Sequence, residues 1–553
     1  MKPWQAYLGI LGLYFGVLLA ALPSAPLTDD DDFYIPAGNR YAEWVLDAAT
    51  FEKGIYSRRK VDAAFEINHE HPPVAKYGLG LSGAVLSRAL GPINGPRVGT
   101  VLFSTLSAAA ILWLAIMGLG RTRGLIAGGL GVWLLLLLPR YFFHSRVATL
   151  DVPVAAMYVL TAALIYRAES KAWAAWVVGP VFGLATATKL NAPFIVAPYL
   201  LYVLLTRRGS GRRLMPVEGA GGIRLPSFPA ALVSMAVLGP LTFWLSWPWL
   251  WFDTFERVGA YVQFHLKHYG IYFLYFGRLY DKDPYAPWTM PFVMAAITIP
   301  LGISVLALLG GVLGLPKVGW RILKGDAVRE AGAEGKAAAR EGELILWVGL
   351  NALVALATVA FSGGAKYGGA KLFMPFFPFW CLLAGYGGLR MLELAARANR
   401  RASVAAVSCL ALVGGSALAQ QVRYFDVPLS QYNGLVGGLR GATAAGFERQ
   451  YYDLAFRDLV ALLSEKAPAN TRVHFLPNNW EYERTFEWYR KEGSLRPDIR
   501  VAKSEGHADW VVVTHERRFR RYAGDLRSHA SWPVVAEERV DGVPIWTVLS
   551  RPR

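Results

Sequence analysis

Long apolar runs separated by short polar stretches dominate this chain. The first run extends from Trp4 to about Pro23, and later ones lie at 98–118, 124–138, 152–167, 172–188, 192–206, 229–251, 288–314, 343–361, 372–390 and 402–421. Runs of this length match the thickness of a bilayer, so each one predicts a membrane-spanning helix. The pattern therefore predicts a polytopic α-helical membrane protein with about 11 transmembrane helices.

Basic residues give these helices an orientation. Lys and Arg gather in loops that follow alternate runs: 121–123, 207–213, 317–340 and 397–401. Because basic loops stay on the cytoplasmic side, we expect these loops and the N-terminus to be cytoplasmic. The loop at 24–73 and the C-terminal part then lie on the periplasmic side.

One apolar segment, Val74 to Leu90, does not fit this alternation. If it crossed the membrane, every later basic block would lie outside, so we expect an interfacial or re-entrant helix buried against protein. The first run carries the Lys2 flank of a signal peptide but no clear small-x-small cleavage site. We therefore expect it to remain as an uncleaved anchor.

Composition excludes several classes of protein. With 54% hydrophobic and 18% charged residues and a mean hydropathy of +0.31, the chain is not an ordinary soluble enzyme. The net charge of +17 lies largely at the ends of apolar runs, so we expect no nucleic-acid partner. Cys381 and Cys409 both lie in apolar runs, which argues against a disulfide framework or a Cys-based zinc site.

The chain changes character after Gln421. Helical patterns at 452–466 and 481–491 alternate with strand-like runs at 472–476, 510–514 and 545–549. These patterns predict a small extracytoplasmic α/β domain over residues 423–553, after a transmembrane domain over 1–422. Since this domain shows no catalytic triad, phosphate loop or metal motif, we expect it to recognise an acceptor or to cap a membrane cavity.

The first periplasmic loop, 24–73, is much longer than a simple connection and opens with Asp29 to Asp32. Its apolar positions recur at helical spacing, which predicts one or two interfacial helices. The acidic run has two interpretations. It is either a solvated patch or N-terminal capping for a helix beginning near Ile35, or it holds a general base that accepts a proton from an acceptor.

Three further loops carry candidate chemistry. His69-Glu70-His71-Pro72-Pro73 is either a plain turn or a cation or phosphate site, and Arg146 with Asp151 is either an interfacial anchor or an anion and proton-transfer site. In the later loops, His265 and His268 could supply a metal ligand. Lys366 and Lys371 could pair with phosphate or simply anchor a helix.

These motifs, taken in order, resemble the dolichyl-phosphate-mannose protein mannosyltransferases and the related lipid A aminoarabinose transferases, which are membrane glycosyltransferases of the C superfamily. The resemblance rests on the acidic pair after the first span, on His-Pro-Pro ending the first loop and on Ser145-Arg146 with Asp151. It also includes the Pro-Phe-Phe-Pro run after Lys371 and the segments around Tyr432-Asn433-Gly434 and Tyr451-Tyr452. It covers roughly the first half of the chain well.

The resemblance implies roles by position. The catalytic acidic pair aligns with Asp30-Asp31, although the family more often has Glu at the second position, and Asp151 matches a further acidic position. Glu70 and His268 would bind a divalent metal, while His71, Arg146, Lys366 and Lys371 would face a phosphate. The implied reaction transfers a sugar, with inversion, from a polyprenyl-phosphate donor among membrane lipids to a periplasmic acceptor such as protein, lipid A or another envelope glycan. The implied location is the bacterial inner membrane.

A different class stays open at this point. Asp, His and Arg at membrane interfaces also occur in secondary transporters and lipid flippases. The ionisable residues here lie in loops and at span ends, and the two halves show no internal repeat. We therefore expect a glycosyltransferase. We expect neither a transporter nor a scaffold without catalytic activity.

Overall fold

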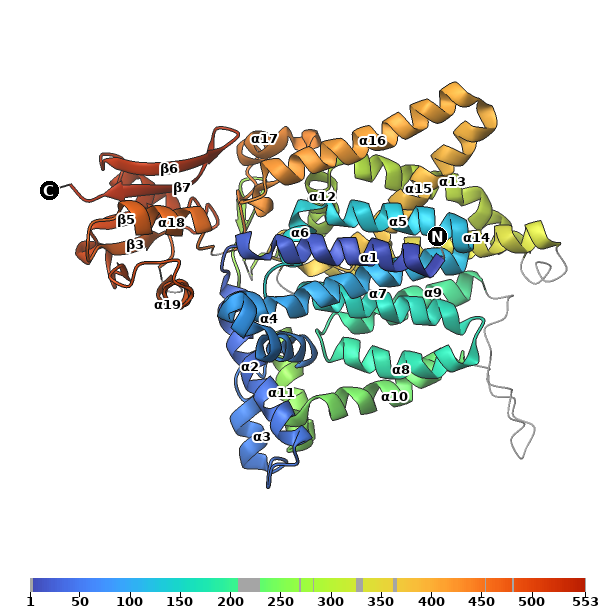
Figure 1. Cartoon of the computed structure of the whole chain (residues 1–553), viewed down its shortest axis with the longest axis horizontal. Helices are drawn as coiled ribbons and strands as arrows, with labels where there is room; N and C mark the ends of the chain where they lie inside the picture. Colours follow the sequence, from blue (N-terminus) through green and yellow to red (C-terminus); the bar gives the residue numbers. More distant parts are fainter. Residues whose placement is uncertain are drawn as a thin grey trace.

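The protein was analysed as a computed structural model that describes residues 3–206, 229–267, 270–281, 283–324, 332–361, 366–452, 454–479 and 482–552. A bundle of roughly parallel and antiparallel helices makes up most of the molecule, and a small mixed sheet domain stands at one end (Figure 1). The two termini lie toward opposite ends of the long axis.

A helix occurs at each apolar run that the hydrophobic pattern identified. The helices are α1 (Pro3–Ala20), α4 (Val74–Leu119), α5 (Arg121–Leu136), α7 (Asp151–Ala168), α8 (Ala172–Thr186), α9 (Val196–Leu205), α10 (Ala230–Ser246), α12 (Met290–Thr298), α13 (Leu301–Lys324), α14 (Ala333–Ala360), α15 (Phe376–Ala398) and α16 (Arg400–Arg423). Within the described ranges, six of them are long and apolar enough to cross a membrane, namely α1, α4, α7, α13, α14 and α16. The protein is thus a largely helical membrane protein, as expected.

The helices differ in how far protein surrounds them. Most of α7 is buried, whereas α1 and α16 expose most of their apolar side chains. An apolar helix exposed in this way is stable in lipid, where every backbone group is satisfied within the helix. α7 is therefore the centre of the bundle, and α1 and α16 lie at its lipid-facing edge.

Helix α4 consists of two helices joined at Gly91. This residue has φ 84° and ψ 167°, values that only glycine adopts without strain. The part before the kink turns away from the bundle axis and is seen nearly end on in Figure 1. It corresponds to the segment from Val74 to Leu90 that broke the topological alternation, and it packs on α2 instead of running alongside the bundle helices.

The loop between α1 and α4 forms two helices, α2 (Asp29–Ala49) and α3 (Arg58–Phe65). α2 begins at Asp29 and not near Ile35 as expected, because Thr28 caps it and the acidic run forms its first turn. The Thr28 hydroxyl accepts the Asp31 N–H at 3.2 Å, and the Asp31 carboxylate accepts the Thr28 N–H at 3.0 Å. Four carboxylates at a helix N-terminus also interact favourably with the helix dipole.

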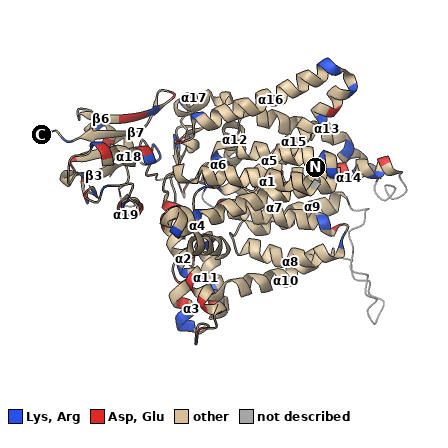
Figure 2. Cartoon of the chain, in the orientation of Figure 1, with Lys and Arg blue, Asp and Glu red and all other residues tan. Residues whose placement is uncertain are grey.

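Short elements complete the end of the bundle that adjoins α2, which we call the loop end. They are η1 (Leu22–Ser24), α6 (Pro139–His144), η2 (Ala192–Ile195), η3 (Pro248–Trp251), α11 (Thr254–Leu266), the hairpin β1 (Phe273–Tyr275) and β2 (Arg278–Tyr280), and η5 (Lys371–Phe373). Lys and Arg gather at the opposite end, near the connection between α15 and α16 and the ends of α13 and α14 (Figure 2). A cluster of basic residues at this end is what the positive-inside prediction expects of a cytoplasmic side.

The C-terminal part contains a five-stranded sheet with the order β4-β3-β5-β7-β6. The strands are β3 (Arg472–Leu476), β4 (Arg500–Val501), β5 (Trp510–Val513), β6 (Val534–Val540) and β7 (Val543–Ser550), and the helices are α17 (Gly438–Ala444), α18 (Arg457–Lys466), α19 (Tyr482–Glu492) and α20 (Tyr522–Ser528), with short turns η6 (Pro428–Ser430), η7 (Gly434–Val436) and η8 (Glu505–His507). β3 runs parallel to β4 and β5, while β7 runs antiparallel to β5 and β6. We call this unit the C-terminal domain.

The C-terminal domain is tied to the start of α2. Leu27 and Ala455 form an isolated antiparallel bridge, and the Tyr489 hydroxyl accepts the Leu27 N–H at 2.9 Å. The Arg457 guanidinium donates to the Ala25 carbonyl at 2.9 Å. The last quarter of the chain is therefore fixed against the segment that carries the acidic run.

Candidate functional site

A cavity of about 420 Å³ lies at the loop end, where α2, the bundle and the C-terminal domain meet. Its polar lining brings together side chains from seven parts of the chain: Asp29, Asp30, Asn68, Glu70, His71, Lys189, Asn191, His265, Tyr367, Lys371, Tyr451, Tyr452 and Arg518. Most of these residues carry groups that can donate or accept a proton or hold a charge. The cavity is therefore the strongest candidate for a functional site.

Asp30 is held in a fixed position at this cavity. The Lys371 Nζ lies 2.9 Å from its Oδ2 and 3.1 Å from its Oδ1, and the Tyr452 hydroxyl donates to Oδ2 at 2.7 Å. Asp30 is only 5% exposed. The ammonium and the hydroxyl fix the orientation of the carboxylate at the cavity wall, which a general base requires.

A second carboxylate shares the same ammonium. The Lys371 Nζ is 3.9 Å from Asp151 Oδ2, and Asp151 is also paired with Lys189 and accepts the Thr149 hydroxyl at 2.9 Å. Burial works against the charge of Lys371, but the carboxylates of Asp30 and Asp151 raise its pKa above the ordinary value. Two carboxylates and two ammonium groups therefore form a compact charge cluster on the cavity wall.

Asp31, the neighbour of Asp30, has a different environment. Its carboxylate is fully buried and accepts a two-point contact from Arg97, with Nε–Oδ1 and Nη2–Oδ2 distances of 2.9 and 2.7 Å. It also accepts the Ala148 N–H at 2.8 Å. These contacts, added to the Thr28 cap, occupy both oxygens. They join α2 to α4 and to the loop before α7.

The other two residues of the acidic run, Asp29 and Asp32, also lie in different surroundings. Asp29 lies on the cavity with Asp30. Asp32 lines a neighbouring groove and accepts the Thr485 hydroxyl at 3.1 Å. Burial raises the pKa of Asp32 to about 6, although Arg484 and the Thr485 hydrogen bond oppose the shift. The four acids of the run therefore occupy three different surroundings.

A buried lysine holds the turn that contains Glu70 and His71. The Lys76 side chain is fully buried, and its Nζ donates to the Asn68 carbonyl at 2.6 Å, to the His71 carbonyl at 2.7 Å and to the Asn68 Oδ1 at 3.0 Å. Burial lowers the pKa of His71 well below its ordinary value, and nearby lysines lower it further. His71 therefore faces the cavity as a neutral imidazole at neutral pH.

The residues proposed for a divalent metal do not form a metal site in the described part of the chain. Glu70 and His71 line the cavity with His265, but Glu70 is engaged by the Asn68 amide at 2.9 Å. Among the described residues there is no group of three His, Cys, Asp or Glu side chains placed to hold a metal ion. His268 lies outside the described residues.

Two predicted phosphate ligands lie elsewhere. The Arg146 guanidinium is buried against the end of α1, where it donates to the Ala21 carbonyl at 2.6 Å and the Ser24 hydroxyl at 2.7 Å and stacks on Phe142. The expectation that Arg146 faces the site therefore does not match the structure, because local backbone acceptors bind its guanidinium. Lys366 is buried in the loop before η5, and Lys371 is the lysine of that loop on the cavity wall.

Sequence reasoning missed several residues of the cavity. Lys189 was not singled out, although a lone lysine between two apolar runs is a detectable signal. Tyr451 and Tyr452 were noted only as part of a family-like segment, and neither was given a role. The contact of Tyr452 with Asp30 joins positions 422 residues apart, and Tyr451 bonds to His144 instead. No local pattern in the sequence reports contacts of that kind.

The cavity also has an apolar side. Leu190 lines it from the turn before η2, Phe194 from η2, Val359 from the end of α14 and Leu372 from η5. Phe194 is 48% exposed, so this wall continues to the surface of the helical bundle. A ligand with a charged head and an apolar tail matches such a lining.

Fold and site together define a polytopic membrane protein with a charged, partly apolar cavity at one end of its helical bundle. Residues 70–244 match the sequence family described as dolichyl-phosphate-mannose-protein mannosyltransferase. This match covers less than half of the chain and agrees with the family that the motifs resemble. No curated protein matches the chain in a sequence search.

Comparison with solved structures gives weak similarities. The crystal structure of ArnT from Cupriavidus metallidurans in the apo state is 13% identical, with 99% of each chain covered and a TM-score of 0.46. The same protein bound to undecaprenyl phosphate is 12% identical with the same coverage and a TM-score of 0.42. The apo oligosaccharyltransferase of Archaeoglobus fulgidus is 11% identical, and the match covers 92% of this chain and 65% of that chain with a TM-score of 0.45.

Proposed function

We propose that this protein transfers a sugar from a polyprenyl-phosphate donor to an acceptor at the periplasmic face of a bacterial inner membrane. One observation carries the proposal: Asp30, Lys189 and Lys371, which are distant in sequence, line a cavity with an apolar side wall. Asp151 is paired with both lysines. A lipid-linked sugar phosphate needs both features, a polar pocket for its head and an apolar path for its chain.

The apolar wall determines how the donor lies. The polyprenyl chain leaves the cavity past Leu190, Phe194 and Val359 toward the lipid. The phosphate then lies near the ammonium groups of Lys189 and Lys371. Positive charge at this position stabilises the lipid phosphate as it leaves with the bonding electrons.

Asp30 acts as the general base in this proposal. It removes the proton from an acceptor hydroxyl or amine as that atom attacks the anomeric carbon, and the bond between this carbon and the phosphate oxygen breaks. Lys371 and Tyr452 hold the carboxylate in place. A single displacement of this kind inverts the anomeric centre.

A metal would supply charge stabilisation at the phosphate. The lysines provide that charge without a metal, and the described residues do not form a complete metal site. Every step proposed here is therefore assigned to side chains of the chain itself.

Replacement of the proposed base tests this function. With purified protein in detergent and a polyprenyl-phosphate sugar, we expect Asp30→Asn to lower the transfer rate by about 10²–10⁴-fold, which is the range for loss of a general base. Asp47→Asn is the matched control, because Asp47 is an exposed residue of the same helix. Equal rates for wild type and Asp30→Asn would reject the mechanism.

A further inference from the structure

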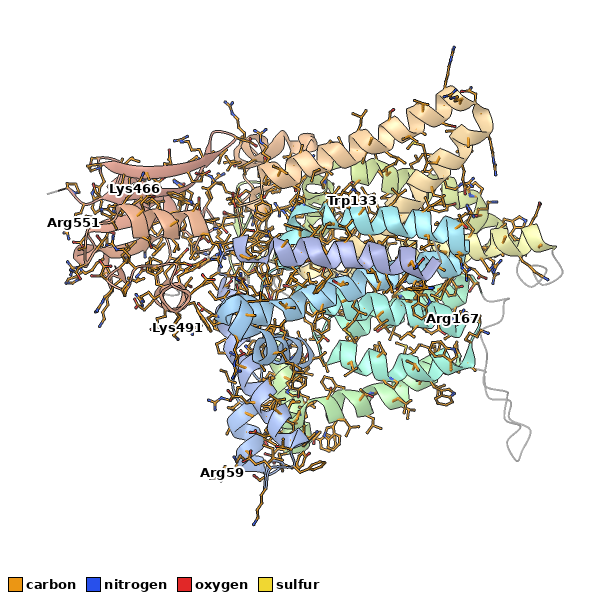
Figure 3. The ribbon with its side chains drawn as sticks, in the orientation of Figure 1. Arg59, Trp133, Arg167, Lys466, Lys491 and Arg551 are labelled. Carbon is orange, nitrogen blue, oxygen red and sulfur yellow. The ribbon has the colours of Figure 1, made fainter. Side chains whose placement is uncertain are left out.

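A second hollow, of about 370 Å³, opens beside the cavity between α2, the 67–70 turn and α19. We call it the α19 groove. Ten residues line it: Asp32, Phe33, Pro36, Ile67, Asn68, Glu70, Arg484, Glu487, Trp488 and Lys491. Lys491 is labelled in Figure 3, on the side of the C-terminal domain that adjoins α2 and α4.

The α19 groove and the cavity are continuous. Phe33, Asn68 and Glu70 line both of them. Asp30 faces the cavity and Asp32 the groove, and only one residue of the same helical turn separates them. A molecule bound in the groove can therefore extend a reactive group into the cavity toward Asp30, on the side away from the apolar wall.

Asp32 shows that the groove is built for a polar ligand. Its side chain is only 6% exposed, and the Thr485 hydroxyl and the Trp488 side chain bond to the carboxylate, but its Oδ1 atom meets no donor in hydrogen-bond geometry among the described residues. An unsatisfied buried acceptor is costly. A ligand hydroxyl or amide that donates to Oδ1 would remove that cost.

The remaining lining defines the class of ligand. Trp488 and Phe33 provide aromatic surface, and Arg484 and Lys491 stack over Phe33 and Trp488 at 5.0 and 5.4 Å. Three acids and two bases surround these rings, so the groove has no excess of positive charge to attract a polyanion. Aromatic faces bordered by donors and acceptors suit a sugar ring, which has apolar C–H faces and a rim of hydroxyl groups.

We propose that the α19 groove binds the acceptor and that this acceptor is an uncharged glycan presenting a hydroxyl group to Asp30. Trp488 would stack on a sugar ring, and Asp32 would accept a sugar hydroxyl. This inference rests on the proposed transfer function and adds to it the class of acceptor.

Binding of defined probes tests the inference. We would titrate the full-length protein in detergent with cellotetraose, a serine-containing peptide and a phosphorylated glycolipid, and follow binding by saturation-transfer NMR. We expect cellotetraose to bind, and Trp488→Ala and Asp32→Asn each to weaken that binding by about tenfold or more. Trp488→Phe should retain most of the binding because it keeps an aromatic face.

Two lysine variants and the Asp30 variant distinguish failure of this inference from failure of the proposed function. Lys491→Ala should weaken cellotetraose binding, while Lys503→Ala, at an exposed lysine outside the groove, should not. Cellotetraose binding that Trp488→Ala and Asp32→Asn leave unchanged would overturn the inference, as would Trp488-dependent binding of the peptide or glycolipid alone. Transfer activity unaffected by Asp30→Asn would instead reject the proposed function.

Discussion

Asp30 and Asp31 are adjacent in the chain, and their carboxylates face different surroundings. Asp30 is on the cavity wall beside Lys371, while Asp31 is enclosed by Arg97, Thr28 and the Ala148 N–H. The sequence predicted chemistry in the acidic run. It could not assign roles within the run, because the partners of each carboxylate are distant in the chain.

This difference predicts opposite defects for two isosteric variants. Asp31→Asn leaves the buried Arg97 without its counter-charge, which costs about 3–5 kcal/mol for a buried pair. We expect a melting temperature lowered by several degrees and poor yield in detergent. Asp30→Asn should lose transfer and lower the melting temperature less, because Lys371 keeps the Asp151 carboxylate at 3.9 Å as a second counter-charge. Thermal unfolding of the two variants, measured side by side, checks this prediction, and equal melting temperatures would contradict it.

Asp32 makes stability depend on pH in the same region. Burial raises its pKa from 3.8 to about 6, so the folded state binds the proton more tightly than the unfolded state does. Stability from this group is present below pH 4 and is lost as the pH rises through about 6. The Asp32→Asn variant has no ionisable group at this position, so it removes the free-energy cost of burying the ionised carboxylate at high pH.

We therefore expect Asp32→Asn to be more stable than wild type at pH 8, by about 1–3 kcal/mol, with the difference vanishing near pH 4. Melting temperatures of both proteins across this pH range provide the measurement. Asp47→Asn, at an exposed position of the same helix, should show no such pH-dependent difference. A constant offset at all pH values would rule out titration of Asp32 as the cause.

At the scale of elements, hydrophobic runs were enough to locate the bundle helices. Long apolar stretches have few alternatives in a bilayer, so composition alone determines where helices form. The structure also gives the physical reason for the exception at Val74 to Leu90, which is the kink at Gly91. The helix in the first loop was harder to predict, because its start depends on the Thr28 cap and the acidic first turn, not on apolar spacing.

Close packing of α2 on α4 depends on two glycines. A Cβ on Gly80 would lie 1.8 Å from the Gly38 carbonyl oxygen, and one on Gly38 would lie 2.8 Å from the Lys76 carbonyl oxygen. Backbone atoms cannot move aside as a flexible side chain can. The first turn of α2 and the Lys76-bound turn therefore keep their places relative to one another through this contact.

We expect Gly80→Ala to separate α2 from α4, with a loss of about 1–3 kcal/mol in stability and a strong loss of transfer activity. Gly349→Ala is the matched control, since a Cβ there meets nothing within 4 Å. In the middle of α14 it should be neutral or gain up to about 1 kcal/mol. Unfolding and transfer assays on both variants make the test. Full activity of Gly80→Ala would show that the contact is dispensable.

At the scale of the whole molecule, charge and hydropathy predict which end of the bundle faces the cytoplasm. Basic residues at the ends of α13 and α14 and at the connection between α15 and α16 lie at one end and the C-terminal domain at the other. The basic loop at 207–213 lies outside the described residues. Labelling of single cysteines tests this orientation. In a background without Cys381 and Cys409, a cysteine at Lys503 should react with an impermeant maleimide from outside the inner membrane. A cysteine at Arg397 should react only after lysis. The reverse pattern would invert the topology.

The assembly of the cavity was not accessible from sequence. Its walls come from α2, the turn at 68–71, η2, η5 and the segment around Tyr452, and only tertiary folding brings these parts together. Motif order identified the family and several of the participating residues. Lys189, Tyr452 and the α19 groove became visible only in three dimensions, because their roles depend on which neighbours they contact.

The bond between Tyr452 and Asp30 has a consequence for biosynthesis. Proteins are made from the N-terminus, so Asp30 is synthesised long before Tyr452, Arg457 and α19. Until then the carboxylate lacks its tyrosine partner, the cavity lacks one wall and the α19 groove does not exist. Under the proposed function, a nascent or prematurely terminated chain would therefore be inactive toward lipid-linked sugars, and activity would begin when the final segment docks.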